Sequence, residues 1–424
     1  MTQRTHDVVV IGSGPGGLAA AIAARQAGAE DVLIIERGLE MGGILLQCIH
    51  HGFGTQTFQE DLPGPAYAQR FVDEARELGI QAMLDTMVLD ITRDRRITVT
   101  SQESGFLELD ARAIVLAMGC RERTRAQIRL PGSRPAGVYT AGTAQRFVNV
   151  EGYMPGRRFV ILGSGDIGMI MARRLTFEGA QVERVLEIMP YLSGLMRNYV
   201  QCLLDFDIPL QLRHTVSRIV GQRRVEAVET VAVDERWAPI PGTQETIPCD
   251  TLLLSVGLIP ENELSRKAGV AIDPVTGGPF VDDGFQTNVP GIFAAGNVVH
   301  VYDLVDWVTE AGTTAGRRAA AHALAQRRPA GNPVQTRAGD NIRYVVPHTI
   351  DPEALTEEGV RLQMRVRQPI EKPVWVEVWT GEERITRSAE RYVRPGEMVT
   401  VILAQKAYDA VRKAQELTVR VVER

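Results

Sequence analysis

The chain has 424 residues, of which 44% are hydrophobic and 23% charged, and its formal net charge is −5. This length favours two or three domains, and the slightly acidic balance argues against a nucleic-acid surface. The four cysteines form no CxxC pair, so we predict no iron–sulfur cradle, zinc ribbon or other metal site. No signal peptide opens the chain and no apolar run reaches the ~20 residues of a membrane span. We therefore expect a cytoplasmic protein without a transmembrane segment.

The first elements follow the pattern of a dinucleotide-binding domain. An apolar strand at 8–11 leads into a Gly-x-Gly-x-x-Gly turn and an alanine-rich helix, and the next apolar strand, at 32–35, ends at Glu36. The motif glycines are Gly12, Gly14 and Gly17. They permit a tight turn, the approach of a pyrophosphate to bare backbone, and close packing of helix on strand, and the helix N-terminus attracts phosphate. Glu36 suits a ribose hydroxyl pair, and Pro15 and Arg37 border the same predicted site.

The segment GGILLQCIHHG follows, and three interpretations of it stay open. In the first, Gly42 and Gly43 admit the cofactor, and Gln47, Cys48 and the two histidines line its far side without covalent chemistry. In the second, Cys48 is a peroxidatic thiol that cycles through sulfenic acid beside a redox cofactor. In the third, Cys48 is a small buried apolar residue. His50 is a candidate proton donor or acceptor at neutral pH, with a solvated loop histidine as the plain alternative.

The dinucleotide pattern then occurs a second time. The strand FVIL precedes a second glycine motif, and Glu187 closes the copy. The glycines are Gly163, Gly165 and Gly168. The spacing from first glycine to acid is 24 residues in both copies, and each copy later ends in an apolar strand closed by glycine, AIVLAMG at 113–119 and TLLLSVG at 251–257. Further candidate contacts are Val88, Ala117 and Gly119 in the first copy and Asp166, Ile167 and Gly257 in the second.

This repetition predicts two dinucleotide-binding domains in series. One protein rarely needs two identical dinucleotides, so we expect one tightly held FAD and one exchangeable nicotinamide dinucleotide. Their reactive rings would meet at the domain interface. The carboxylate of Glu187 favours a free ribose 2′-hydroxyl over a 2′-phosphate, which predicts NAD(H) rather than NADP(H).

Residues 287–324 resemble the flavin-closing segment of the two-dinucleotide-binding-domain flavoproteins, the group around thioredoxin and glutathione reductase. In that group the strand ends in Gly-Asp, whereas here it ends in Gly296-Asn297. The resemblance implies that Asn297 contacts the flavin ribityl region, as an uncharged hydrogen-bonding side chain. It also implies that the following helix points its N-terminus at the flavin pyrimidine. The candidate residues at the helix start are Asp306, Trp307 and Val308, with a plain N-cap as the alternative role of Asp306.

Together these elements predict an α/β fold of two Rossmann-like dinucleotide-binding domains plus a small C-terminal β-rich domain. The FAD-binding domain is expected at residues 1–148 and 284–327, with the NAD(P)-binding domain, 149–283, inserted in it. A Pro/Gly-containing linker is expected at 328–341. From 342–424 apolar and polar residues alternate with period two, which predicts strands. This last domain is assigned to docking or dimerisation, with a stabilising cap as the alternative.

Phrases such as LAMGCRERTR and GNVVHVYDLVD resemble one branch of the pyridine nucleotide-disulfide oxidoreductases, here without the redox disulfide. The branch is related to alpha subunits of opine, sarcosine and hydrogen cyanide-forming oxidoreductases and to flavoproteins found beside glycerol-3-phosphate dehydrogenase. The resemblance implies a partner flavoprotein or iron–sulfur subunit, and a homodimer stays open. The leading hypothesis is an FAD-dependent oxidoreductase that moves electrons between NAD(H) and such a partner. The alternatives are a stand-alone NADH oxidase or peroxidase using Cys48, and a nucleotide-binding redox-sensing or assembly scaffold.

Overall fold

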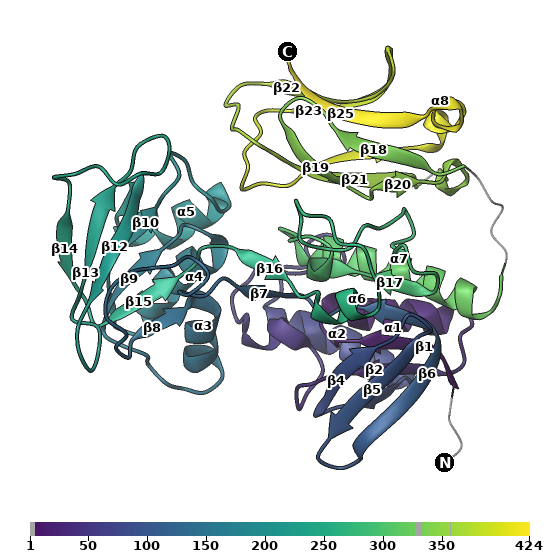
Figure 1. Ribbon diagram of the computed structural model, residues 1–424, viewed down its shortest axis with the longest axis horizontal. Coiled ribbons are helices and arrows are strands. Elements are labelled where there is room, and N and C mark those ends of the chain that lie inside the picture. Colours follow the sequence, from purple (N-terminus) through teal and green to yellow (C-terminus); the bar gives the residue numbers. More distant parts are fainter. Residues whose placement is uncertain (1–4, 327–331, 357) are drawn as a thin grey trace. The chain divides into compact units, whose positions relative to one another are not determined.

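The computed structural model describes residues 5–326, 332–356 and 358–424 of the chain (Figure 1). These residues form two compact units. The first contains the chain up to Cys120 and again from Pro260 to Arg424, and the second contains Arg121–Ile259. Both units carry parallel sheets flanked by helices, which confirms the predicted α/β class.

The inserted unit differs from the predicted range 149–283. It begins at Arg121, because β8 (Val138–Thr140) pairs with the sheet of the second unit. It ends at Ile259, because residues after this point, such as Val270, are buried in a core of the first unit.

The predicted linker at 328–341 differs as well. Residues 328–331 lie outside the described residues. Half of the remainder is a strand, β18 (Val334–Ala338), which pairs in parallel with β25 (Glu416–Glu423). The first residue of β18, Val334, is buried in the core of the C-terminal domain. Flanking Pro and Gly residues therefore mark the ends of a short strand and not a continuous linker.

The first unit is built on a seven-stranded sheet with the order β3-β2-β1-β6-β5-β4, in which β17 also pairs with β6. Strands β3, β2, β1, β6 and β17 run parallel, whereas β4 and β5 are antiparallel to their neighbours. The bounds are β1 (Thr5–Ile11), β2 (Val32–Ile35), β3 (Gln81–Met83), β4 (Thr86–Ile91), β5 (Arg96–Ser101), β6 (Gly105–Leu116) and β17 (Ile292–Ala294). The carboxyl ends of β1, β2, β6 and β17 therefore lie along one edge, where ligands of such sheets bind.

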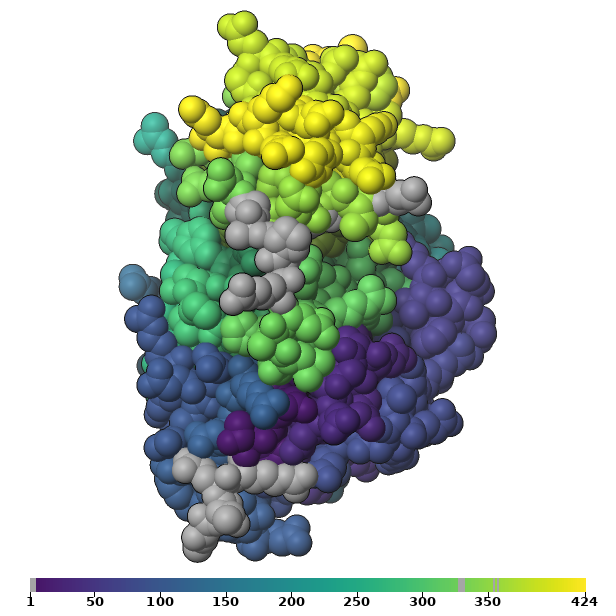
Figure 2. All heavy atoms as spheres, turned by 90° about the vertical axis from the view of Figure 1, so that its right-hand side faces the viewer, coloured from purple at the N-terminus to yellow at the C-terminus, as the bar shows by residue number. Residues whose placement is uncertain are grey.

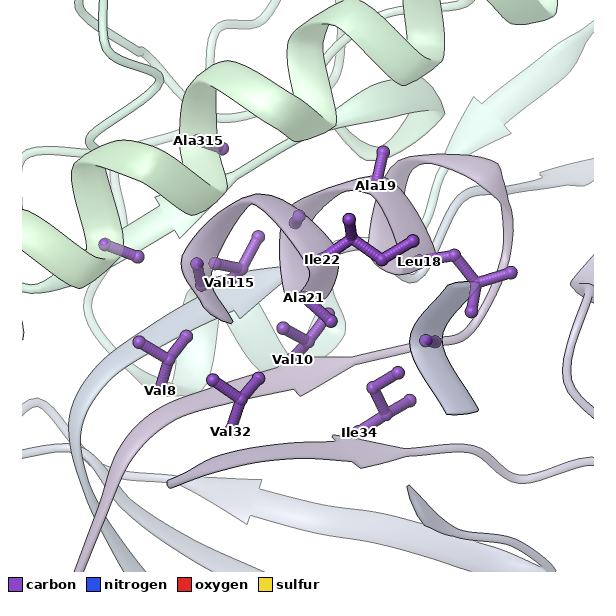
Figure 3. Close-up of a cluster of buried hydrophobic side chains, with 14 of the residues drawn as sticks. Val8, Val10, Leu18, Ala19, Ala21, Ile22, Val32, Ile34, Val115 and Ala315 are labelled. Atoms are coloured by element: carbon purple, nitrogen blue, oxygen red, sulfur yellow. The ribbon is translucent and has the colours of Figure 1, made fainter. Parts of the chain in front are cut away.

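Helix α1 (Pro15–Gln26) packs between this sheet and α7 (Val305–Ala323). Every residue of α1 from Gly16 to Ala24 is buried, as expected for a helix that is apolar on all sides. Figure 3 shows strand side chains pointing toward this helix, and they include Val8, Val10, Val32 and Ile34. Small residues let α7 approach closely, since a Cβ at Gly312 would lie only 2.2 Å from the carbonyl oxygen of Gly16.

Shorter elements complete the part of the first unit that precedes the C-terminal domain. They are η1 (Gly43–Gln47), α2 (Gly64–Glu77), α6 (Glu263–Lys267) and η3 (Gly296–Val298). Two short strands, β7 (Cys120–Glu122) and β16 (Leu258–Pro260), pair with each other and contain the points at which the chain leaves and re-enters this unit.

The second unit repeats the parallel-sheet architecture on a smaller scale. Its five-stranded sheet has the order β11-β10-β9-β15-β8, with all pairs parallel, and a separate antiparallel sheet has the order β12-β13-β14. The strands not yet given are β9 (Arg158–Leu162), β10 (Gln181–Glu187), β11 (Leu210–Leu212), β12 (His214–Val220), β13 (Ala227–Ala232), β14 (Glu245–Pro248) and β15 (Thr251–Leu254). The helices are α3 (Ala141–Asn149), α4 (Asp166–Phe177), α5 (Met196–Cys202) and η2 (Leu204–Phe206).

The C-terminal domain, from β18 onward, belongs to the first unit and is β-rich as predicted. A sheet of order β20-β18-β25-β22-β23 faces a second sheet of order β19-β21-β24 across one apolar core. Its remaining strands are β19 (Ile342–Val346), β20 (Thr349–Ile350), β21 (Val360–Val366), β22 (Val374–Thr380), β23 (Glu383–Glu390) and β24 (Val399–Leu403). The short helices are η4 (Pro352–Ala354), η5 (Gln405–Ala407) and α8 (Tyr408–Lys413). Within the described residues, no helix is both long and apolar enough to cross a membrane.

The C-terminal domain is docked on the part of the first unit that precedes and begins α7, and Figure 2 shows its yellow and yellow-green atoms seated on the green ones. Tyr344 and Val346 of β19 are buried in the same core cluster as Ile292 of β17. His300, which follows η3, is 1% exposed and contacts the Tyr344 hydroxyl through Nδ1 at 3.4 Å. Burial, assisted by the charge of Arg365, lowers the pKa of His300 to about 3.

The buried His300 makes stability depend on pH in a defined direction. Its pKa is about 6.5 in the unfolded chain and lower in the folded one. Below pH 6.5 only the unfolded chain therefore takes up the proton, so a contribution that is complete above pH 6.5 is lost as the pH falls. We expect the free energy of unfolding to decrease by roughly 1–2 kcal/mol from this group between pH 6.5 and 5. Urea titrations at each pH should show a flatter dependence in His300→Phe.

A matched control is His51→Gln, because the side chain of His51 is 66% exposed. That variant should keep the wild-type dependence on pH. An identical pH profile in the wild type and His300→Phe would contradict the assignment of the effect to His300.

Candidate functional site

The first glycine motif forms a tight turn between β1 and α1. Gly12 has φ +100°, a conformation that side chains other than glycine rarely adopt, and a Cβ there would lie 2.5 Å from the carbonyl oxygen of Ala117. A Cβ at Gly17 would lie 1.9 Å from the carbonyl oxygen of Gly12. The predicted residues Gly12, Gly17 and Ala117 are thus brought together where the carboxyl ends of β1 and β6 meet the start of α1.

Gly14 and Pro15 begin helix α1, and the space beside Gly14 is empty. Gly14 is the N-cap of α1, Pro15 is its first residue, and the first turn has neither a side-chain cap nor an acidic residue. A Cβ at Gly14 would meet nothing within 4 Å. Uncapped N–H groups at a helix N-terminus beside open space form an anion-binding site, so these residues fit the pyrophosphate of a dinucleotide.

Hydrogen bonds from the glycine turn fix the side-chain carboxylate of Glu36. Its Oε2 accepts hydrogen bonds from the backbone N–H of Ser13 at 2.8 Å and from the Ser13 hydroxyl at 2.7 Å, and its Oε1 accepts the N–H of Gly38 at 2.7 Å. A carboxylate oxygen has two lone pairs, so Oε1 keeps one for a ribose hydroxyl. The neighbouring Arg37 is exposed.

The second unit has the same arrangement, in which hydrogen bonds fix the carboxylate of Glu187. Oε2 of Glu187 accepts the Ser164 N–H at 3.0 Å, the Ser164 hydroxyl at 2.6 Å and the Ser193 hydroxyl at 2.6 Å, while Oε1 accepts the N–H of Met189 at 2.9 Å. Sequence reasoning missed Ser13 and Ser164. The signal was available, because both motifs read Gly-Ser-Gly.

The remaining predicted residues of the second unit surround the same turn. Gly163 has φ +99°, and Cβ atoms at Gly163 and Gly168 would lie 2.1 and 2.6 Å from Ser255. Gly165 is the N-cap of α4, and Asp166 and Ile167 begin the helix. The carboxylate of Asp166 accepts the Leu195 N–H at 2.9 Å and the Asn198 side-chain amide at 2.7 Å. Gly257 accepts the N–H of Arg123 at 3.0 Å after β15.

Gly42 and Gly43 place η1 directly against the first glycine turn. The N–H of Gly42 donates to the carbonyl oxygen of Ser13 at 3.0 Å, and a Cβ at Gly43 would lie 2.8 Å from Cα of Gly14. Gln47 is buried at the end of this short helix. The segment therefore packs against the first glycine turn, and the first interpretation of GGILLQCIHHG, in which it admits and lines a cofactor, stays a prediction.

Cys48 and His50 lie at the end of the same segment. The Cys48 thiol is half-buried and donates to the carbonyl oxygen of Ile44 at 3.3 Å. Burial raises the pKa of Cys48 to about 12, whereas nucleophilic cysteines have a lowered pKa. His50 contacts the carbonyl oxygen of His51 through Nδ1 at 2.9 Å and packs on Phe53. No group of three or more His, Cys, Asp or Glu in the described ranges is arranged to hold a metal ion.

Gly119 follows β6 and Asn297 follows β17, and Asn297 contacts Cys120, the residue after Gly119. The Asn297 side-chain amide donates to Cys120 Sγ at 3.6 Å, and its Oδ1 accepts the N–H of Tyr302 at 3.0 Å. Gly119 has open space beside its Cα, and Gly296 lies against the side chain of Val308 at the start of α7. These predicted flavin contacts therefore converge from three separate parts of the chain.

The start of α7 differs in detail from the prediction. The helix begins at Val305 with Leu304 as its N-cap, so the alternative that Asp306 is only an N-cap is wrong. Oδ1 of Asp306 instead accepts the N–H groups of Gln56 and Thr57, at 3.2 and 2.7 Å. Its Oδ2 is buried and has no hydrogen-bond partner among the described residues. A buried acceptor of this kind calls for a donor, which a bound cofactor can supply. Trp307 and Val308 complete the first turn.

The side chain of Val88 does not lie with the other predicted flavin contacts. It lies on β4 and is 8% exposed within a core cluster on the opposite face of the sheet from α1. The apolar pattern of β4 could not distinguish a core residue from a contact residue.

Comparison with known proteins places the chain in a family. A sequence model of the family described as pyridine nucleotide-disulphide oxidoreductase matches residues 6–325. The chain belongs to this family. It is therefore a flavin-dependent oxidoreductase built on Rossmann-type domains. The match ends before the C-terminal domain, whose role the family does not explain.

The relatives agree with this membership. An opine oxidase subunit from Agrobacterium tumefaciens (strain Ach5) is 26% identical over 343 residues, which are 76% of this chain and 65% of that protein. The thioredoxin reductase of Listeria innocua serovar 6a is 25% identical over 70% of this chain and 86% of its own length. Among solved structures, T. acidophilum thioredoxin reductase superposes with a TM-score of 0.63 at 22% identity, covering 76% of this chain and all of that one.

Two glycine substitutions separate folding from binding in the first turn. Gly17→Ala places a methyl group against the Gly12 carbonyl and should destabilise the first unit by ~1–3 kcal/mol.

Gly14→Ala adds its methyl group to open space at φ −66°, so the fold should be kept. The same methyl group would occupy the phosphate approach, so FAD affinity should fall about tenfold or more. Urea unfolding and FAD titration of the apoprotein measure the two effects. Tight FAD binding by Gly14→Ala would contradict the site.

Proposed function

We propose that this protein uses FAD to pass electrons between NAD(H) and an acceptor or donor held by a partner subunit, without an internal dithiol. The observation that carries the proposal is a hydrogen-bonded serine–glutamate pair that occurs in both units. Ser13 fixes the carboxylate of Glu36 in one unit, and Ser164 fixes that of Glu187 in the other. Two sites with the same chemistry imply two dinucleotides. When bound, FAD accepts two electrons from a reduced nicotinamide and passes them on.

The first unit is the proposed FAD site. Gly14 and the uncapped start of α1 hold the pyrophosphate, Glu36 accepts from a ribose hydroxyl, and Asn297 hydrogen-bonds the ribityl chain. The first turn of α7 lies at the same edge of the sheet, where Asp306 offers a buried acceptor without a partner among the described residues. Positive charge density at a helix N-terminus stabilises negative charge on a bound ring.

The second unit is the proposed nicotinamide-nucleotide site. Gly165 opens the N-terminus of α4, and Glu187 presents its Oε1 to the ribose. We propose NAD(H) as the physiological nucleotide, because a carboxylate repels a 2′-phosphate and the residues that follow it, Ile188–Met189–Pro190, carry no cation.

The names of relatives support a partner. One relative is named as a subunit of opine oxidase, and another as the ferredoxin reductase component of chlorobenzene dioxygenase. This chain matches 65% and 50% of these two proteins, so their activities are not transferred to it. The four cysteines, Cys48, Cys120, Cys202 and Cys249, are far apart in the sequence and form no CxxC or CxxxxC pair, which supports an electron path that leaves the chain for a partner.

An anaerobic titration tests the proposal. NADH should bleach the flavin absorbance of the holoprotein within seconds, and NADPH should do so at least ~10-fold less efficiently, a difference of about 1.4 kcal/mol. A flavin spectrum that stays oxidised under excess NADH would favour the scaffold hypothesis instead. Faster bleaching by NADPH would overturn the nucleotide assignment alone.

The thiol of Cys48 is not needed in this scheme. Because its pKa is raised to about 12, it is protonated at neutral pH and a poor nucleophile. Cys48→Ala should therefore leave the rate of flavin reduction by NADH within about twofold of wild type, and NADH-dependent peroxide turnover equally unchanged. Stopped-flow reduction and a peroxide assay check this. Loss of peroxide turnover in the variant would restore the peroxidase alternative.

A further inference from the structure

The segment 299–304 connects two proposed flavin contacts. It begins directly after η3, which contains Asn297, and ends at Leu304, the N-cap of α7. Within it, the N–H of Tyr302 donates to Oδ1 of Asn297 at 3.0 Å. Any displacement of this segment would therefore move both the Asn297 side chain and the first turn of α7. What holds the segment determines the shape of that part of the site.

Arg365, a side chain of the C-terminal domain, holds segment 299–304 in place. Arg365 of β21 forms an ion pair with Asp303 and donates to the carbonyl oxygen of Val301 at 3.1 Å. The same guanidinium donates to the carbonyl oxygen of Gly396 at 2.8 Å, in the loop before β24. A planar guanidinium can make such contacts in several directions at once, which an ammonium group cannot.

The carboxylate of Asp303 completes the connection. Its second oxygen accepts the N–H of Met398 at 2.5 Å. The side chains of Asp303 and Arg365 are only 9% and 14% exposed, so solvent competes little for these bonds. The ion pair thus joins segment 299–304 to β21 and to the loop before β24 of the C-terminal domain.

Apolar packing extends the contact of the C-terminal domain from segment 299–304 to the start of α7. Met398 forms a small buried cluster with Tyr302 and Ala311, and Trp307 and Val308 of the first turn of α7 pack against it. The C-terminal domain therefore touches the residues that are proposed to face the flavin, as well as the segment that precedes them.

We propose that Arg365 and Asp303 are positioning residues, through which the C-terminal domain fixes segment 299–304 and thereby the flavin-facing side of the site. The inference rests on the proposed function, since it takes FAD to bind beside Asn297 and α7. It assigns the domain a role beyond that of a cap, because a cap would stabilise the fold without altering the flavin.

The experiment uses the full chain in four variants. Arg365→Met and Asp303→Asn each remove one partner of the pair, and the double variant removes both charges. Arg361→Met is the matched control, because Arg361 also lies on β21 and pairs at 3.1 Å with Glu310 of α7, but in a more exposed position beyond the first turn. The measurements are the dissociation constant of FAD from the apoprotein, the visible spectrum and reduction potential of the bound flavin, and urea unfolding of the apoprotein.

We expect Arg365→Met to raise the FAD dissociation constant at least ~10-fold and to shift the flavin spectrum and potential, with Arg361→Met within about twofold of wild type. Removing one charge of a buried pair also destabilises a fold, whereas removing both restores much of the stability. The double variant should therefore recover the apoprotein's resistance to urea and yet keep the weakened FAD binding.

Recovery of both stability and FAD affinity in the double variant would overturn the proposal and leave the C-terminal domain as a stabilising cap. Equal loss of FAD affinity in Arg361→Met would also overturn it, because the effect would then belong to docking of the domain in general. Failure of the wild-type protein to take up FAD would instead contradict the proposed function, so the two failures are distinguishable.

Discussion

The close approach of α1 to its neighbours is the constraint on which the rest of the structure depends. On one side, Gly17 lets α1 meet the turn after β1, since a side chain there would overlap the Gly12 carbonyl. On the other side, Gly312 and Gly316 let α7 meet α1 at the carbonyl oxygens of Gly16 and Ala20. The two helices are therefore held at backbone contact distance. Their N-termini open near the carboxyl ends of the same parallel strands, which is where a long anionic cofactor needs them.

The sequence predicted this part of the fold well because its requirements are local. A glycine is demanded wherever a Cβ would strike a carbonyl, so the spacing of Gly12, Gly14 and Gly17 reports backbone geometry directly. The repetition of that spacing from Gly163 onward was enough to predict the second nucleotide-binding unit. The alternating tail likewise predicted its strands, because one face of each packs into a core.

What the sequence left open depends on contacts between distant residues. Ser13 and Ser164 stand in the Gly-Ser-Gly that both motifs share, but their bonds to Glu36 and Glu187 span 23 residues, so the repeat does not show which residues they contact. The unit boundary at Arg121 was missed for the same reason, since pairing of β8 with β15 decides it. Asp303 and Arg365 are 62 residues apart. Only the docking of one domain on another brings them together, and no local pattern encodes it.

The pairing of β7 with β16 has a consequence for how such a chain is assembled. The chain crosses into the second unit at Cys120–Arg121 and returns at Ile259–Pro260, and both crossings lie within these two hydrogen-bonded strands. The entrance and the exit are thus neighbours, so excising residues 121–259 would leave ends that a short bridge can rejoin. A module with adjacent termini can be exchanged for another without re-threading its host. The second Rossmann-type unit is in this sense an interchangeable part.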